Sequence, residues 1–143
     1  MKRGGFTLLE LLIVIAVVGL LVAAMIPLFR TSKKDAQIAK TKADLDVLVS
    51  AHHRVFYDTG VATISPRNFS DVSYPVPGWN GPYVTEACLD PWGNNYQSST
   101  YWSSNGVTTT RTIYFFSRGP NGVYENGTGD DIWILVRNET YPD

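Results

Sequence analysis

Residues 11–29, LLIVIAVVGLLVAAMIPLF, carry no charged side chain, and this segment constrains the fold more than any other part of the chain. The apolar run over residues 6–29 is 24 residues long. At about 1.5 Å per helical residue, that is enough to cross the ~30 Å hydrocarbon layer of a membrane. The rest of the 143-residue chain is ordinarily polar, and the net charge is -1. These features exclude a simple cytosolic globule and a fully disordered chain.

The remaining composition narrows the possible functions. The single cysteine, Cys88, excludes an intramolecular disulfide framework and a CxxC metal site. Twelve basic side chains stand against thirteen acidic ones with no basic run, so we expect no nucleic-acid partner. Most aromatic residues follow residue 54, and they give the C-terminal part enough bulk for a small core.

Glu10 is the unusual residue of the apolar run. A cleaved secretory signal does not fit, because the run exceeds the ~7–15 residues of a signal core and no A-x-A-like site follows it. A plain membrane anchor does not explain the acid, because an ionised carboxylate inside a membrane helix costs about 2.5–3.5 kcal/mol on insertion scales. Glu10 is therefore a candidate functional residue.

The string GGFTLLELLIVIAVVGLLVAAMIP, which begins at Gly4, resembles the N-terminal signal of type IV pilins and of the pseudopilins of type II secretion. The resemblance implies that prepilin peptidase cuts after Gly5 and that Phe6 becomes the methylated N-terminus. It also implies that Glu10 pairs with the N-terminal amine of a neighbouring subunit. Such pairing would offset much of the cost of removing the carboxylate from water.

Gly19 and Pro27 are the helix-weakening positions of the apolar run. Membrane helices tolerate both residue types, so their spacing alone leaves the meaning open. In the resembled family, the stretch between these two positions is often partly unwound in the assembled fibre. The resemblance therefore implies that Gly19 and Pro27 assist assembly.

The resemblance divides the chain into a leader at residues 1–5, a transmembrane and filament-core helix at residues 6–30, and a globular domain at residues 31–143. Basic residues flank both ends of the span, so charge does not decide its orientation. The resemblance implies a precursor that crosses the inner membrane once, with its N-terminus in the cytoplasm. The globular domain then lies outside, in a periplasmic or extracellular filament after assembly.

Residues 33–58 are predicted to continue the helix, because apolar side chains recur at three- and four-residue spacings and no breaker separates them from the apolar run. Strand-forming residues concentrate at residues 94–99, 109–118 and 131–139. The loop over residues 59–79 is predicted to be irregular, with one helical turn at residues 66–71. The expected fold class is α+β and pilin-like: a long N-terminal helix packed on a small three-stranded antiparallel sheet.

His52 and His53 stand next to each other in the predicted helix. Adjacent helical side chains diverge by roughly 100°, so they chelate a metal poorly compared with an i, i+4 pair. We expect one histidine to be half-buried against the domain and the other to be solvated.

Two loop motifs narrow the resemblance to the major pseudopilins of type II secretion. The segments WNGPY at residues 79–83 and DPWGNNY at residues 90–96 resemble the GPY and DPWGNxY signature of that group. Asp-Pro and Gly-Asn are turn-forming pairs, and Trp92 and Tyr96 can cover a small core.

The second motif, SRGPNG at residues 117–122 with ENGTGDDI at residues 125–132, resembles a loop that wraps calcium in major pseudopilins. Calcium takes about six to eight oxygen ligands from carboxylates, amides and backbone carbonyls. The resemblance implies five ligand positions: the side chains of Asn121, Asp130 and Asp131, and the backbone carbonyls near Arg118 and Thr128. Asn121 stands where aspartate is usual, which removes one charged ligand. The alternative is a solvated acidic hairpin.

These features predict a structural subunit of a helical pilus-like filament and no enzyme, with the major pseudopilin of a type II secretion system as the nearest group. The implied partners are further copies of the chain, prepilin peptidase, an assembly platform, minor pseudopilins and the inner membrane. A type IV pilus subunit is the alternative within this class.

A membrane-anchored adhesin or ligand-binding module is the alternative of another class, with exposed aromatics such as Trp79 or Trp102 as contacts. A tethered enzyme has no support, since the chain has no G-x-S-x-G and no Cys/His pair at plausible spacing. Cys88 also lacks any cue for a reactive thiolate.

Overall fold

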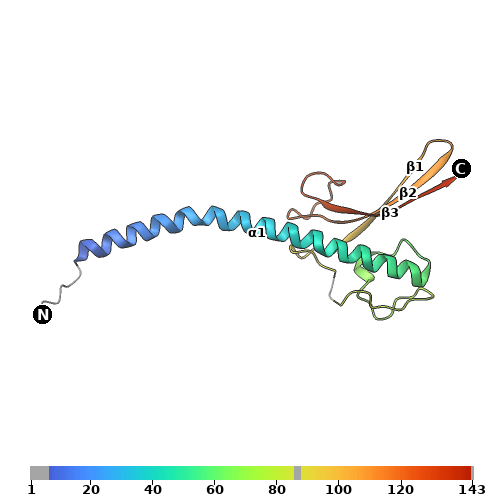
Figure 1. Ribbon diagram of the computed structural model, residues 1–143, viewed down its shortest axis with the longest axis horizontal. Helices are drawn as coiled ribbons and strands as arrows, with labels where there is room; N and C mark the ends of the chain where they lie inside the picture. Colours follow the sequence, from blue (N-terminus) through green and yellow to red (C-terminus); the bar gives the residue numbers. More distant parts are fainter. Residues whose placement is uncertain (1–6, 86–87, 143) are drawn as a thin grey trace. The chain divides into compact units, whose positions relative to one another are not determined.

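The computed structural model describes residues 7–85 and 88–142. Its elements are helix α1 (Leu8–Thr59), a short 3-10 helix η1 (Pro66–Asn68), and strands β1 (Gln97–Ser104), β2 (Thr108–Ser117) and β3 (Ile132–Pro142) (Figure 1). The chain divides into two compact units, Met1–Gln37 and Ile38–Asp143, and the division falls inside α1.

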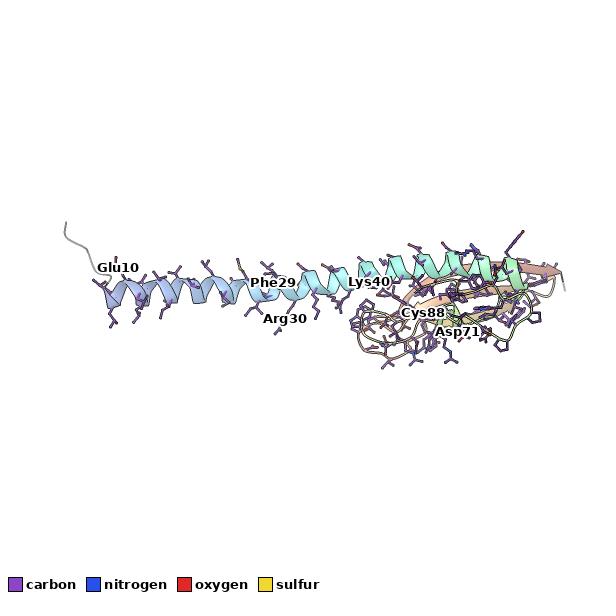
Figure 2. All side chains as sticks on the ribbon, turned by 90° about the horizontal axis from the view of Figure 1, so that it is seen from below. Glu10, Phe29, Arg30, Lys40, Asp71 and Cys88 are labelled. Atoms are coloured by element: carbon purple, nitrogen blue, oxygen red, sulfur yellow. The ribbon has the colours of Figure 1, made fainter. Side chains whose placement is uncertain are left out.

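In the N-terminal unit, α1 is helical without a break through Gly19 and Pro27. Pro27 has no backbone N–H to donate to the preceding turn. Its carbonyl oxygen accepts a hydrogen bond from Thr31 Oγ1 at 3.2 Å. Figure 2 shows side chains projecting from this part of the helix on both sides, and all of its large apolar side chains are exposed. Within the described residues, α1 is long and apolar enough to cross a membrane. Whether the Gly19–Pro27 stretch unwinds in a fibre stays a prediction.

The predicted three-stranded antiparallel sheet is confirmed, with the order β1-β2-β3. In this register Ser99 pairs with Tyr114 and Phe116 pairs with Trp133, and a β-bulge interrupts the β2–β3 ladder between Ile113 and Tyr114. The ends of β2 and β3 differ from the predicted ends by one to three residues.

The prediction of a strand over residues 94–99 is wrong in position, because β1 begins at Gln97 and extends to Ser104. The residues before it form a turn. The Asp90 amide donates to the Asn94 carbonyl at 2.8 Å, and Gly93 closes the turn at a φ of 89°. The helical turn predicted at residues 66–71 is shorter than expected, and it spans the three residues of η1.

The core of the globular unit joins the second half of α1 to one face of the sheet. Buried side chains at three- and four-residue spacings on the helix meet buried side chains of β2 and β3, which confirms the predicted amphipathic pattern. These residues are Leu45, Leu48, Ala51 and Val55 from α1, and Ile113, Phe115 and Val136 from the sheet. The expected α+β fold class is confirmed.

His52 is fully buried in this core, deeper than expected, while His53 is exposed. The His52 Nε2 atom lies 3.0 Å from the Ala62 carbonyl oxygen, and the His52 ring meets the Phe115 ring edge-on at 5.5 Å. The Nδ1 atom is buried without a hydrogen-bond partner in the described part of the chain. Burial is the main cause that lowers the pKa of His52 below its ordinary value.

We expect the globular unit, expressed as residues 31–143, to lose stability as the pH falls below about 6.5, the ordinary histidine pKa. In that range His52 is protonated in the unfolded chain but not in the folded chain, because its pKa is lower when folded. Acid therefore favours unfolding. His52→Gln keeps a donor near Ala62 and cannot titrate, so it should flatten this slope in urea unfolding between pH 7.5 and 5. His53→Gln, the matched control, should keep it. Identical slopes for wild type and His52→Gln would refute the assignment.

Candidate functional site

Glu10 lies in the first turn of α1 and closes a hydrogen-bonded box with Thr7. Glu10 Oε2 accepts from Thr7 N at 3.2 Å and from Thr7 Oγ1 at 3.1 Å, and Thr7 Oγ1 accepts from Glu10 N at 3.2 Å. This is a capping box, in which two side chains satisfy backbone amides that the first helical turn leaves unpaired. This capping role adds to the predicted one, and its signal in the sequence is a Thr three residues before a Glu ahead of an apolar run.

Of the other predicted processing and assembly residues, Gly19 lies within the described helix. Gly5 and Phe6, the predicted cleavage and methylation positions, lie outside the described residues. A Cβ added at Gly19 would meet no described atom within 4 Å. Packing within this chain therefore does not require glycine at position 19.

Asp90 connects the two loop motifs. Its Oδ1 accepts from the amides of Trp92 at 3.0 Å and Asn94 at 2.8 Å, which holds the DPWGN turn. Its Oδ2 accepts from the buried Ser117 hydroxyl at 2.6 Å, and Ser117 Oγ accepts in turn from the Gly119 amide at 3.0 Å. The first motif thus fixes the start of the second, a link that neither segment reveals alone.

The motif tyrosines fasten the loops to α1. Tyr96 is 2% exposed, and its hydroxyl donates to Asp44 Oδ2 at 2.9 Å. Tyr83 donates in the same way to Asp58 Oδ2 at 2.7 Å. The pKa of each phenol is raised, mainly by burial and secondly by the hydrogen bond to its carboxylate partner. Tyr96 therefore covers the core as predicted, while Trp92 is only partly buried.

The acidic loop, residues 118–131 between β2 and β3, is organised by its own carboxylates. Asp131 Oδ2 accepts from the amides of Glu125 at 2.8 Å and Gly127 at 3.0 Å. Asp130 Oδ2 accepts from the Asn121 amide at 3.0 Å. Glu125 Oε2 accepts from the Asn121 side-chain amide at 3.2 Å and from the Asp130 amide at 3.1 Å. Glu125 is a residue that the sequence analysis missed, because its place in the network depends on how the loop folds.

Two glycines make this arrangement possible. Both have a positive φ, 63° at Gly119 and 61° at Gly129. A Cβ at Gly119 would lie 2.2 Å from the Asp130 carbonyl oxygen, and a Cβ at Gly129 would lie 1.9 Å from Glu125 Oε2. At Gly119 the Asp130 backbone leaves no room for a side chain, and at both positions the positive φ favours glycine.

The remaining carboxylate oxygens of Asp130 and Asp131 bear on whether the loop can hold a metal. Asp130 Oδ1 and Asp131 Oδ1 are both buried, and neither has a hydrogen-bond partner in the described part of the chain. Buried polar atoms without partners cost free energy, and a cation bound at either atom would satisfy it. Residues 7–85 and 88–142 contain no group of three His, Cys, Asp or Glu side chains that could hold a metal. A cation in this loop would thus also need neutral oxygens, which calcium accepts.

Two of the predicted ligand groups already accept hydrogen bonds within the loop. Asn121 Oδ1 accepts from the Val123 amide at 2.6 Å, and the Thr128 carbonyl accepts from the Asp131 amide at 3.1 Å. The Arg118 side chain points to β1, where its Nη2 donates to Gln97 Oε1 at 3.1 Å. The structure therefore brings Asn121, Asp130 and Asp131 into one loop.

The structure also places the two tryptophans predicted as exposed ligand contacts, Trp79 and Trp102, and the single cysteine, Cys88. Trp79 is only partly exposed, because its ring packs on Tyr83 at 4.8 Å and on Tyr74 at 5.2 Å, so the prediction of an exposed contact there is wrong. Trp102 is 61% exposed. Cys88 is buried, and burial raises the pKa of its thiol to about 11, which keeps it protonated and unreactive.

Known proteins resemble the chain in both its N-terminal segment and its fold. The family model described as the prokaryotic N-terminal methylation motif matches residues 1–26. Type II secretion system core protein G of Pectobacterium carotovorum subsp. carotovorum is 30% identical over 152 residues, which cover 94% of this chain and 86% of that protein. Fimbrial protein EcpB of Eikenella corrodens is 37% identical over 65 residues, covering 46% of this chain and 41% of EcpB.

A solved structure agrees with the sequence relatives. The crystal structure of the major pseudopilin from the type 2 secretion system of enterohaemorrhagic Escherichia coli matches with a TM-score of 0.52 and 27% identity, covering 72% of this chain and 86% of that one. The likeness to protein G extends over nearly the whole chain, whereas the fimbrial likeness covers less than half. The chain therefore belongs to the type II secretion system core protein G family, the major pseudopilins.

Proposed function

We propose that this chain is made as an inner-membrane precursor, cut after Gly5, methylated at Phe6, and packed through its apolar helix into a type II secretion pseudopilus. The observation that carries the proposal is the exposed apolar surface of α1. Soluble monomers rarely expose contiguous apolar patches beyond a few hundred Å². Lipid covers this surface before assembly, and neighbouring copies cover it afterwards.

Glu10 gives the assembly its register. The capping box holds the Glu10 carboxylate at the N-terminal end of the helix, against the Thr7 amide. Cleavage after Gly5 creates a positive amine at Phe6, one residue before Thr7. An amine from a neighbouring copy then meets an oriented carboxylate at the same depth. Gly19, which this chain does not need for its own packing, leaves room for close approach of a neighbouring helix.

The acidic loop holds calcium in this proposal. Asp130 and Asp131 supply carboxylate oxygens, and their two buried unpartnered atoms support this. Asn121 and the backbone carbonyls near Arg118 and Thr128 complete the ligand set, with Glu125 close by in the same network. Calcium would supply positive charge between the two adjacent acids. The loop residues themselves order the backbone that leads into β3.

The family is one of structural pseudopilin subunits, and we propose that this chain likewise has no catalytic activity. Its partners would be further copies, prepilin peptidase, the assembly platform and minor pseudopilins, with no nucleic acid. The proposed parts are a leader at residues 1–5, a membrane and filament-core segment at residues 6–30, and a globular domain at residues 31–143. That domain would enter the periplasm first, with the N-terminus in the cytoplasm.

Electron microscopy of cells that express the chain with its secretion machinery tests this function. We expect thin fibres that antibody against the globular unit labels, and that become long enough for shearing to release when the chain is overexpressed. At native expression, short, periplasm-bound fibres indicate a pseudopilus, and long extracellular fibres indicate a type IV pilus. A precursor that accumulates in the membrane and never forms labelled fibres would contradict the proposal.

A further inference from the structure

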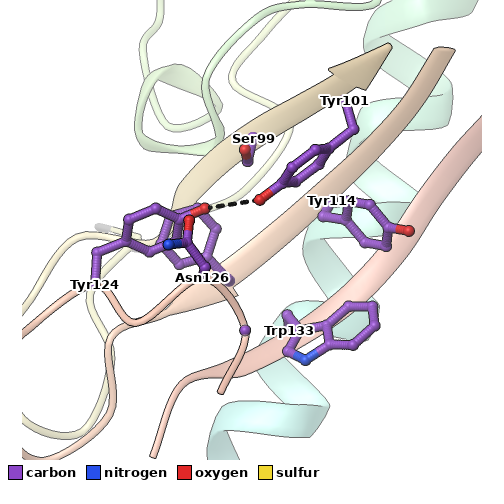
Figure 3. Close-up of a pocket in the computed structure, with 8 residues that line it drawn as sticks. Ser99, Tyr101, Tyr114, Tyr124, Asn126 and Trp133 are labelled. Carbon is purple, nitrogen blue, oxygen red and sulfur yellow. Dashed lines mark hydrogen bonds between the residues drawn. The ribbon is translucent and has the colours of Figure 1, made fainter. Parts of the chain in front are cut away.

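The face of the sheet turned away from the core carries a hollow of about 250 Å³ (Figure 3). Side chains alternate along β2, so that Ile113 and Phe115 enter the core while Tyr114 faces the hollow. Tyr101 from β1 and Trp133 from β3 stand beside Tyr114, and Tyr124 closes the side next to the acidic loop. The filament function described above assigns nothing to this hollow.

The aromatic rings form walls instead of a closed stack. Tyr101 and Tyr114 meet at 6.0 Å and 78°, and Tyr114 and Trp133 meet at 5.0 Å and 77°. These edge-to-face contacts leave ring faces open, and Tyr101 and Trp133 remain 49% and 51% exposed. Large, half-exposed rings that hold each other in place present rigid apolar surfaces to a ligand.

Neutral hydrogen-bonding groups surround the platforms. The hydroxyls of Tyr101 and Tyr124 lie 3.3 Å apart, and Ser99 and Asn126 add a hydroxyl and an amide. The described residues that line the hollow include no charged side chain. A charged ligand would therefore leave water without a compensating charge, whereas a neutral ligand with hydroxyl groups would find partners.

Asn126 is held at the hollow by an unusual backbone. Its φ is 56°, the left-handed region that asparagine adopts more readily than most other residues. The Asp131 carboxylate fixes the turn through the Gly127 amide, and a Cβ at Gly127 would lie 3.2 Å from Trp133 Nε1. The loop therefore fixes the backbone at Asn126 beside the hollow, and Gly127 lets that backbone approach the Trp133 indole.

We propose that this hollow binds one neutral sugar ring. A pyranose has an apolar C–H face that suits the negative face of an aromatic ring, and a rim of hydroxyls that suits the four polar groups above. The volume lies below the ~300 Å³ low end of sites for drug-sized ligands, which fits a single ring of a longer glycan. The proposal does not depend on filament assembly.

The test uses the full chain in detergent micelles without a sugar headgroup, in millimolar calcium, and saturation-transfer NMR. The probes are cellobiose, maltose and N,N′-diacetylchitobiose, with choline as a cationic probe because aromatic cages also bind quaternary ammonium. We expect saturable transfer to ring protons of at least one disaccharide and none to choline. Asn126→Gly, which suits the positive φ, and Trp133→Ala should each weaken the affinity at least tenfold.

Trp102→Ala is the matched control, since Trp102 is an exposed tryptophan on β1 outside the hollow. It should leave the affinity unchanged, and the melting temperatures of the variants should show that all remain folded. The proposal is overturned if none of the three disaccharides receives saturation. It is equally overturned if Asn126→Gly and Trp133→Ala both bind like wild type, or if choline binds and the sugars do not.

Discussion

Replacing Glu10 by glutamine should reduce the yield of sheared fibres at least tenfold, while the precursor level and the melting temperature of the globular unit stay unchanged. Glutamine can serve the capping box with Thr7, so the variant removes the charge and keeps the helix start. Removing one partner of a buried ion pair costs about 3–5 kcal/mol, which is more than a tenfold loss per contact. Immunoblots of sheared fractions, normalised to precursor, measure the effect.

Thr7→Ala is the complementary control, because it removes the capping box and keeps the carboxylate. Loss of an N-cap costs about 0.5–2 kcal/mol of helix stability, a local cost that leaves the charge pair available. We expect fibres in near-normal yield from Thr7→Ala. If Thr7→Ala abolished fibres and Glu10→Gln did not, Glu10 would be a helix cap and no more.

Millimolar calcium should raise the melting temperature of residues 31–143 by roughly 10 °C over chelator. A ligand that binds only the folded form stabilises it by about 2.7 kcal/mol at a hundredfold excess over Kd, which converts to a shift of that order for a domain of this size. Magnesium should substitute poorly, because it demands a smaller and more regular octahedron. Coincident melting curves in calcium and in chelator would leave Asp130 and Asp131 as an ordinary acidic turn.

Variants separate calcium binding from the internal bonds of the loop. Asp131→Asn keeps an oxygen that can accept from the Glu125 and Gly127 amides, yet it loses the charge, so it should abolish the calcium shift with little change in chelator. Asp131→Ala should abolish the shift and also destabilise the loop. Asn121→Asp replaces a donor to Glu125 with a repelling carboxylate, so it should melt lower in chelator and gain more from calcium.

The long helix and the sheet could be predicted because their signals are local: an uncharged apolar run, three- and four-residue spacing, and clustered strand formers. The start of β1 could not be predicted, because Asp90 holds residues 92–94 in a turn. Ser117, which is distant in sequence, helps to hold that turn through its bond to Asp90. The depth of His52 was underestimated for a similar reason. Its cover comes from Phe115 and from the Ala62 carbonyl, which are distant in sequence or on an irregular loop.

The site residues likewise divide into those that a local motif reveals and those whose role depends on the folded backbone. Asn121, Asp130 and Asp131 could be found because they lie in a short motif, whereas the part of Glu125 depends on the backbone path between them. The aromatic hollow was not foreseen, because Tyr101, Tyr114 and Trp133 become neighbours only through the strand register and the bulge at Ile113. The sequence pointed instead to Trp79, which the Tyr83 ring partly covers.

The intact mass of the subunit taken from sheared, antibody-labelled fibres tests the central claim most directly, since it joins processing to assembly in one particle. We expect a chain that begins at Phe6, carries one added methyl group at its N-terminus, and otherwise extends to Asp143. A fibre subunit that still begins at Met1, or one cut after the apolar run of residues 6–29, would contradict the account.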